Sequence, residues 1–237
     1  MKLYLMQLAL FQPIAAPVPG YLIQTDEGIN VLVDTGLPYS AIHNLQGPPG
    51  LQLEMKEADY VVNQLANIGL RPADIQFSVC THFDPDHGGN HDVFNTAELI
   101  VQRRHYEIAR AGYPRFATVR DHWDHPNLRY RLIDGDTVLL PGIELIETSG
   151  HVPGHQSVLV RLPETGPVIL AIDAIAERSM LDPDSRPIHP TDEDEVGVRA
   201  STRKLVDLAQ REGVGLMVHG HDSQQWPTLK HAPEYYA

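Results

Sequence analysis

Short apolar runs separated by turn residues dominate this chain, and the pattern predicts a fold built mostly from β-strands. Glycine, proline, aspartate and asparagine cluster between the runs, as turns require. We expect a proline-rich link at 13–20 between the first two strands, and a turn at Thr25–Gly28 that closes a hairpin. The expected strands cover residues 2–10, 21–24, 29–33, 77–80, 97–101, 128–133, 137–140, 143–148, 157–162, 168–172 and 214–218.

A few segments carry apolar residues at helical spacing instead. Residues 57–68 do so and stop at Gly69, and residues 198–210 form the second clear amphipathic helix. A shorter helix is expected over 102–110, whereas 111–127 has weak periodicity and predicts an irregular insertion near the mouth of a pocket. Two further connections are expected as loops, Gly47-Pro48-Pro49-Gly50 and the acidic segment 177–195.

Composition narrows the class of protein. A chain of 237 residues that is 42% hydrophobic and 21% charged is typical of one globular domain, here expected to span 1–237. The formal net charge of −13 argues against nucleic acid as a partner. Gln7 and Gln12 interrupt the apolar N-terminus, which therefore predicts a first strand, not a signal peptide or a membrane anchor. The lone Cys80 forms no internal disulfide, and we expect a cytoplasmic protein.

Metal-competent side chains follow the expected strand 77–80. His82, Asp84, Asp86 and His87 fall within six positions. Imidazole nitrogens and carboxylate oxygens are standard ligands of divalent metals, so this loop predicts a metal site. The alternative is a solvated loop that happens to be rich in histidine and aspartate.

The same kind of residue ends four other expected strands, at Asp34, His151, Asp173 and His221. A single histidine after a strand is more often a hydrogen-bonding residue than a ligand. Neighbouring strand ends lie within side-chain reach of one another, however, and a rigid sheet can hold ligands in a common cavity. Five such strand ends in one chain favour the metal site.

These motifs resemble those of the metallo-β-lactamase superfamily and, within it, of the N-acyl-homoserine lactonases. The resemblance implies an α/β fold, an αββα sandwich of two mixed β-sheets flanked by helices. It spans almost the whole chain. The matching motifs, in the order of the family, are Val33–Gly36, His82–His87 with Gly88–Asn90, Gly150–Ser157, Ile172–Ala174 and Gly220–Asp222.

The resemblance also implies two divalent metal ions and their ligands. The first ion would take His82, Asp84 and His151. The second would take Asp86, His87 and His221, with Asp173 bridging both ions. Asp34 would either support a ligand as a hydrogen-bond acceptor or simply end its strand in a turn, and His155 and His219 would have supporting or structural roles without binding metal. Most other histidines are expected at the surface, namely His43, His91, His105, His122, His125, His189 and His231.

Two positions depart from the family pattern. Asp84 stands where the motif His-x-His-x-Asp-His usually has its second histidine. Zinc is the metal the resemblance implies, but a carboxylate hardens the site and favours iron or manganese, and flavodiiron proteins carry a glutamate there. Ala176 stands where homoserine lactonases often have a tyrosine that binds the substrate carbonyl, so more of that role would fall to the metal.

The implied activity is hydrolysis of a small-molecule lactone or ester, N-acyl-homoserine lactones foremost, which is a quorum-quenching reaction. A hydroxide bridging the two metals would attack the carbonyl, and Asp86 would carry the proton to the leaving group. A serine mechanism is disfavoured because no Gly-x-Ser-x-Gly motif occurs. Three alternatives stay open: a thioester hydrolase similar to glyoxalase II, a di-iron redox or oxygen-binding protein, and a non-catalytic metal-binding protein. A homodimer is one open oligomeric state.

Overall fold

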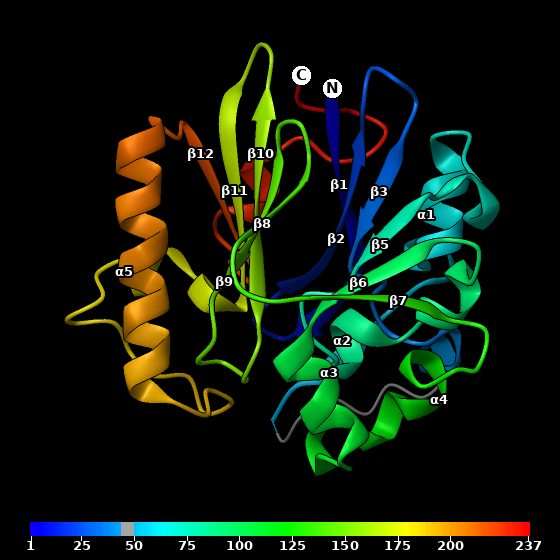
Figure 1. Ribbon diagram of the computed structural model, residues 1–237, viewed down its shortest axis with the longest axis horizontal. Helices are drawn as coiled ribbons and strands as arrows, with labels where there is room; N and C mark the ends of the chain where they lie inside the picture. The colour runs from blue at the N-terminus through cyan, green and yellow to red at the C-terminus, as the bar shows by residue number, and fades with distance from the viewer. Residues whose placement is uncertain (44–49) are drawn as a thin grey trace.

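Two mixed β-sheets lie face to face at the centre of the molecule (Figure 1). The computed structural model describes residues 1–43 and 50–237, and over these ranges the sheets have seven and five strands, in the orders β4-β1-β2-β3-β5-β6-β7 and β12-β11-β10-β9-β8. The first sheet contains β1 (Lys2–Gln12), β2 (Ala16–Gln24), β3 (Asn30–Val33), β4 (Gln52–Glu54), β5 (Phe77–Val79), β6 (Glu98–Gln102) and β7 (Arg129–Ile133). The second contains β8 (Thr137–Leu140), β9 (Ile143–Glu147), β10 (Gln156–Leu162), β11 (Gly166–Ile172) and β12 (Leu216–His219).

Helices cover the outer faces of both sheets, so the predicted αββα sandwich is confirmed (Figure 1). The α-helices are α1 (Val61–Asn67), α2 (Pro85–Gly88), α3 (Arg103–Arg110), α4 (Arg120–Trp123) and α5 (Glu195–Glu212). The short 3-10 helices are η1 (Tyr39–His43), η2 (Glu57–Asp59), η3 (Pro72–Asp74), η4 (His91–Phe94), η5 (Pro114–Val119), η6 (Asp173–Ile175), η7 (Arg178–Met180) and η8 (Trp226–Thr228). Among the described residues, none of these helices is long and apolar enough to cross a membrane.

The inner faces of the two sheets form the central core. Val33 and Val79 of the first sheet pack in one cluster with Val158 and Leu170 of the second. Each of these strands is buried on its other face too, which is why the sequence shows short continuous apolar runs instead of strict alternation. The core therefore holds the ends of β3, β5 and β11 at fixed positions.

Helix α5 shows how the local sequence sets an element's limits. Its N-cap is Asp194, whose side chain accepts a hydrogen bond from the Gly197 amide, and Gly213 ends it in the left-handed conformation at φ 66°. Between them Leu205 and Leu208 pack on the outer face of the second sheet. Both caps lie outside the predicted range 198–210, so the helix is longer than its apolar stripe.

The proline-rich link is largely strand, contrary to the prediction. β2 starts at Ala16, and Pro17 and Pro19 pair with Leu10 and Gln7 of β1. β3 pairs with residues 21–24 only. The prolines therefore lie on a stretch of β2 that has β1 on one side and no ladder partner from β3 on the other, where a missing N–H costs nothing.

The other predictions of secondary structure are confirmed in some places and wrong in others. The turn at Thr25–Gly28 and its hairpin are confirmed, with Gly28 at φ 82°. The helix expected at 57–68 splits into η2 and α1, and the short strand β4 was not predicted. The prediction of an irregular insertion at 111–127 is wrong, because η5 and α4 occupy most of it. Of the predicted loop Gly47-Pro48-Pro49-Gly50, the first three residues lie outside the described ranges.

Candidate metal centre

The strand ends that carry histidine and aspartate meet at one edge of the sandwich. Asp34 follows β3, and the loop with His82 follows β5, its parallel neighbour. Asp173 follows β11, and His221 follows β12, again a parallel pair. His151 comes from the connection between β9 and β10. Parallel strands deliver their carboxyl ends to the same edge, so the two sheets place these side chains around one cavity.

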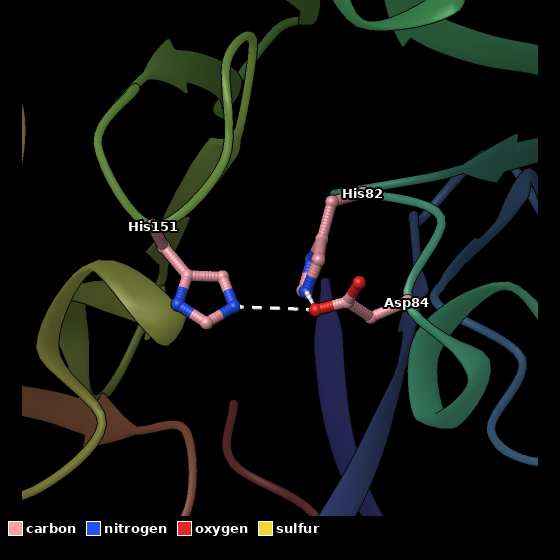
Figure 2. Close-up of side chains that lie close together, drawn as sticks. All are labelled: His82, Asp84 and His151. Atoms are coloured by element: carbon pink, nitrogen blue, oxygen red, sulfur yellow. Dashed lines mark hydrogen bonds and ion pairs between the residues drawn. The ribbon is translucent and has the colours of Figure 1, made fainter. Parts of the chain in front are cut away.

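Two groups of side chains could each hold a metal ion, and we call them the first and second ligand sets. The first ligand set consists of His82, Asp84 and His151. Figure 2 shows the two imidazole rings turned toward the Asp84 carboxylate. The Nε2 atoms of His82 and of His151 each lie 3.3 Å from Oδ2 of Asp84. All three side chains are buried.

The second ligand set consists of Asp86, His87 and His221. Nε2 of His87 lies 3.7 Å and Nε2 of His221 lies 3.9 Å from Oδ2 of Asp86. His87 is fully buried at the end of α2, while Asp86 and His221 each keep 17% of the side chain exposed. This set is therefore the one more open to solvent.

Asp173 lies between the two sets and turns one oxygen to each. Its Oδ2 is 3.3 Å from Nε2 of His151 and 3.8 Å from Nε2 of His82. Its Oδ1 is 3.1 Å from Nε2 of His221 and 3.5 Å from Nε2 of His87. A carboxylate so placed can bridge two cations, one through each oxygen.

Each histidine of the two sets is fixed through its Nδ1 atom. Nδ1 of His87 donates to Oδ2 of Asp34 at 2.8 Å, and Nδ1 of His151 donates to Oδ1 of Asp192 at 3.0 Å. For the other two, the partners are the hydroxyl of Thr81, 3.0 Å from Nδ1 of His82, and the carbonyl of Pro17, 2.7 Å from Nδ1 of His221. These bonds orient all four rings with Nε2 toward the cavity, the arrangement found behind metal-binding histidines.

The arrangement fits divalent cations. Nε2 of His82, Nε2 of His87 and Oδ1 of Asp173 are buried and have no hydrogen-bond partner in the described part of the chain. Buried polar atoms without partners are costly, so such a cluster calls for an ion. Ligand atoms held about 2.0–2.2 Å from a tetrahedral zinc ion lie roughly 3.3–3.6 Å apart, close to the separations seen here.

Burial and charge act on these groups in opposite directions. Burial, with the neighbouring His87, lowers the pKa of His82 to about 3. Burial also disfavours the charged form of His87, but the carboxylates of Asp173, Asp86 and Asp34 outweigh it and raise the pKa of His87 to about 10. The surrounding carboxylates thus strongly favour a cation at this position.

A cavity of about 310 Å³ opens over both ligand sets. Its base carries the polar groups of the sets, and Ala176 contributes to its wall. A pocket with reactive polar groups on one side and apolar side chains on the other suits a ligand with a polar head and an apolar chain. The apolar wall is formed by Phe11, Ile14, Leu51 and Met180.

Two charged residues of the site were missed in the sequence. Arg115 of η5 forks onto Asp84, with Nε 2.7 Å from Oδ1 and Nη2 2.5 Å from Oδ2. Asp192, which orients His151, also accepts from the buried Arg186 at 3.2 Å. Neither Arg115 nor Asp192 ends an apolar strand. The only sequence signals were that Arg115 lies in the segment expected near a pocket mouth, 111–127, and that Asp192 lies in the acidic segment expected as a loop, 177–195.

Several histidines outside the two ligand sets are also buried. His155 is buried, with its ring 5.1 Å from that of His82 and its Nδ1 bonded to Thr148. His219 is buried at 4% exposure and does not line the cavity over the ligand sets. The prediction of surface positions is wrong for His91 and His105, which are both buried. His105 serves as a core hydrogen-bond bridge, because its ring accepts from the Phe83 amide at 2.9 Å and donates to the Pro153 carbonyl at 2.7 Å.

Known proteins share this arrangement of sequence and fold. The sequence model of the Metallo-beta-lactamase superfamily matches residues 15–221. An N-acyl homoserine lactonase of Bacillus cereus is 35% identical over 227 residues, which cover 92% of this chain and 86% of that protein. The N-acyl homoserine lactonase AttM of Azorhizobium caulinodans is 34% identical, over 93% and 87% of the two chains.

Solved structures agree with the sequence relatives. An N-acyl homoserine lactone hydrolase with the product N-hexanoyl-L-homoserine at its catalytic metal centre superposes with a TM-score of 0.88 at 30% identity, covering 99% of this chain and 98% of that one. A single-residue mutant of AiiA from B. thuringiensis, with N-decanoyl-L-homoserine bound at the active site, gives a TM-score of 0.89 at 30% identity, again over 99% and 98%.

Proposed function

We propose that this chain, which belongs to the metallo-beta-lactamase superfamily, opens the lactone ring of N-acyl-homoserine lactones in a reaction that depends on two divalent cations. Membership of the superfamily and the class of metal-dependent hydrolase follow from the matched family and from the lactonase relatives. The choice of lactone as substrate, of zinc, iron or manganese as metal, and of the cytoplasm as location is our proposal.

The observation that carries the proposal is the position of Asp173. Its two oxygens face different ligand sets, at 3.3 Å from His151 and 3.1 Å from His221. A carboxylate in a structural hydrogen-bond network would not need four inward-facing histidines around it. We therefore assign the first ligand set to one cation and the second to another, with Asp173 as their common ligand.

The chain's own residues would divide the work of hydrolysis. When bound, the cations supply a water that is nucleophilic near neutral pH and a Lewis acid for the lactone carbonyl. Asp86 lies on the cavity wall and keeps part of its side chain exposed, so it can pass a proton to the departing alkoxide. Asp34 and Asp192 hold His87 and His151 in the tautomer that leaves Nε2 free to bind.

The shape of the cavity supports an acylated substrate. Phe11, Ile14 and Met180 offer an apolar surface beside the ligand sets. Two solved relatives hold acylated homoserines at the corresponding centre. Ala176 has no hydroxyl for the substrate carbonyl. In this chain polarisation of that carbonyl therefore depends on the cation and on side chains that line the same cavity.

The test is turnover of a small panel of substrates by protein loaded with zinc, manganese or iron. N-acyl-homoserine lactones with short and long chains, a simple lactone and a glutathione thioester are compared by proton release and chromatography. We expect the acyl-homoserine lactones to give the highest kcat/KM, at least about 10⁴ M⁻¹s⁻¹. A preference for the thioester would instead favour a glyoxalase II type of hydrolase.

A pair of aspartate variants checks that the activity arises at this site. Asp86→Asn should lower kcat by at least about 100-fold, because it removes the proton carrier and the carboxylate of the second ligand set. Asp207→Asn is the matched control, since Asp207 is exposed on α5 and does not line the cavity. Metal-loaded protein that opens no lactone at all would contradict the proposal and favour a non-catalytic metal-binding protein.

A further inference from the structure

Arg115 is the only arginine or lysine among the described residues that forms an ion pair with a member of either ligand set. Its guanidinium has five N–H donors, and each has an acceptor. Nε and Nη2 contact the two carboxylate oxygens of Asp84, and Nη2 is also 2.8 Å from Nε2 of His151. Nη1 donates to the Thr191 carbonyl at 2.6 Å and to Oε1 of Glu193 at 3.1 Å.

Two of these acceptors are the atoms that a cation of the first ligand set would need. Oδ2 of Asp84 and Nε2 of His151 point at the same place, 3.3 Å from each other, and Nη2 of Arg115 contacts both. A lone pair that accepts from a guanidinium is not available to a metal. A divalent cation and the guanidinium also repel each other at such a short distance.

The position of Arg115 is held from outside the ligand set as well. Thr191 and Glu193 belong to the segment that carries Asp192, the residue that orients His151. One side chain thus ties η5 to this segment across the first ligand set. Only 20% of the Arg115 side chain is exposed, and its guanidinium binds both oxygens of Asp84. The side chain therefore has a defined position in the site.

We propose that the Arg115 guanidinium competes with the divalent cation for the first ligand set, so that the two sites of the centre fill in order, the second ligand set first. The second set contains no comparable competitor in the described ranges: Asp86 has ion-pair contacts only with His87 and His221. The first set fills when Arg115 withdraws toward Glu193. This inference rests on the proposed metal centre but not on the identity of the lactone.

The test counts metal and needs no activity. Metal-free protein is dialysed against buffered Zn²⁺ and, separately, Mn²⁺, and bound metal is measured by mass spectrometry together with the dissociation constant of each equivalent. We expect wild type to bind one equivalent tightly and a second at least roughly tenfold more weakly. Arg115→Ala should tighten the weaker equivalent by roughly tenfold or more and leave the tight one unchanged.

Three further variants make the result decisive. Arg115→Lys keeps the charge without the fork and should give an intermediate affinity. Arg120→Ala, at an exposed arginine of the neighbouring α4 that pairs with Asp124, should behave as wild type. His221→Ala should abolish the tight equivalent, which assigns that equivalent to the second ligand set.

The outcomes separate the two proposals. Two equivalents of equal affinity in wild type, or an unchanged weaker equivalent in Arg115→Ala, would overturn the competition while leaving the metal centre in place. No uptake of metal by wild type or by Arg115→Ala would overturn the proposed metal centre and the competition together. Thermal unfolding of each metal-free variant shows that the protein assayed is folded.

Discussion

The two ligand sets share Asp173 but differ in how their second carboxylate is balanced. Asp84 of the first set pairs with Arg115 at 2.5 Å, whereas the ion-pair partners of Asp86 in the described part of the chain are both histidines. The family motif has a neutral histidine at position 84, so Asp84 adds a negative charge that Arg115 offsets. The pair Asp84–Arg115 is thus a neutral unit in place of a neutral ring. The Asp86 carboxylate is therefore available to a metal cation, whereas the Asp84 carboxylate is already paired with the Arg115 guanidinium.

The largest expected effect tests what the two sets have in common. Asp173→Ala removes the carboxylate between them, and we expect loss of both metal equivalents and at least about a 1,000-fold loss of kcat/KM. Metal content and lactone opening are measured on the same preparation. Asp222→Ala is not a suitable control because Asp222 anchors the amide of Arg178 beside the site, so Asp207→Asn serves again. Retention of two equivalents by Asp173→Ala would reject the bridging role.

The next largest effect is expected from the aspartates that accept hydrogen bonds from ligand histidines, because each of them supports only one of the two sets. Asp34→Asn weakens the support of His87, and Asp192→Asn weakens that of His151. Each should lower metal affinity by roughly 10–100-fold, and only for the equivalent that its own histidine binds. Asparagine suits position 34, whose φ is 59°, since it tolerates the left-handed region.

Metal titrations of the two variants decide the point. The comparison of the two sets holds if Asp34→Asn affects the tight equivalent and Asp192→Asn the weak one. If either variant weakened both equivalents alike, the sets would be one coupled unit and the comparison would fail. The double variant should show the sum of the two losses in free energy if the sets are independent.

The smallest expected effect is on folding stability, through His91, which lies outside both ligand sets. Knowing how stability depends on pH allows metal binding to the two sets to be compared without interference from unfolding. His91 is buried at 1% exposure, and burial lowers its pKa to about 3 from an ordinary 6.5. Below pH 6.5 the unfolded chain binds a proton there that the folded chain does not. Folding stability should therefore fall as pH drops from 6.5 toward 3, by about 1.4 kcal/mol per pH unit from this group.

Urea unfolding between about pH 7 and pH 5 measures this contribution. His91→Gln should flatten the pH dependence, and His125→Gln, at a position in the 111–127 segment away from the ligand sets, should leave it as in wild type. An unchanged slope in His91→Gln would mean that the acid sensitivity comes from other groups. Metal titrations can then be carried out at a pH where folding stability does not change.

The site residues at strand ends could be predicted from the sequence, but the side-chain contacts between segments far apart in the sequence could not. Asp34, His82 and Asp173 each follow an apolar run, and parallel strands bring such ends together. Arg115 follows no such run. Its neighbours Phe116 and Val119 are buried, but 3-10 turns have no long period that would identify them.

One signal toward Arg115 was nevertheless present. Asp84 puts a carboxylate where the family has a neutral ring, and a buried carboxylate needs a cation or a donor beside it. The sequence does not say whether that cation is a metal or a side chain. The same limit applies to the proline-rich link at 13–20, where only the pairing of β3 with residues 21–24 reveals that the prolines of β2 have no ladder partner on that side.

The hydrogen bond from His221 to the Pro17 carbonyl links positions 204 residues apart. The His221 ring of the second ligand set is oriented by β2, the second strand of the chain. During synthesis, His221 leaves the ribosome long after Pro17 has done so. The proposed metal centre therefore stays incomplete in a growing chain until the segment that carries His221 docks against β2, and cation uptake can report that docking step.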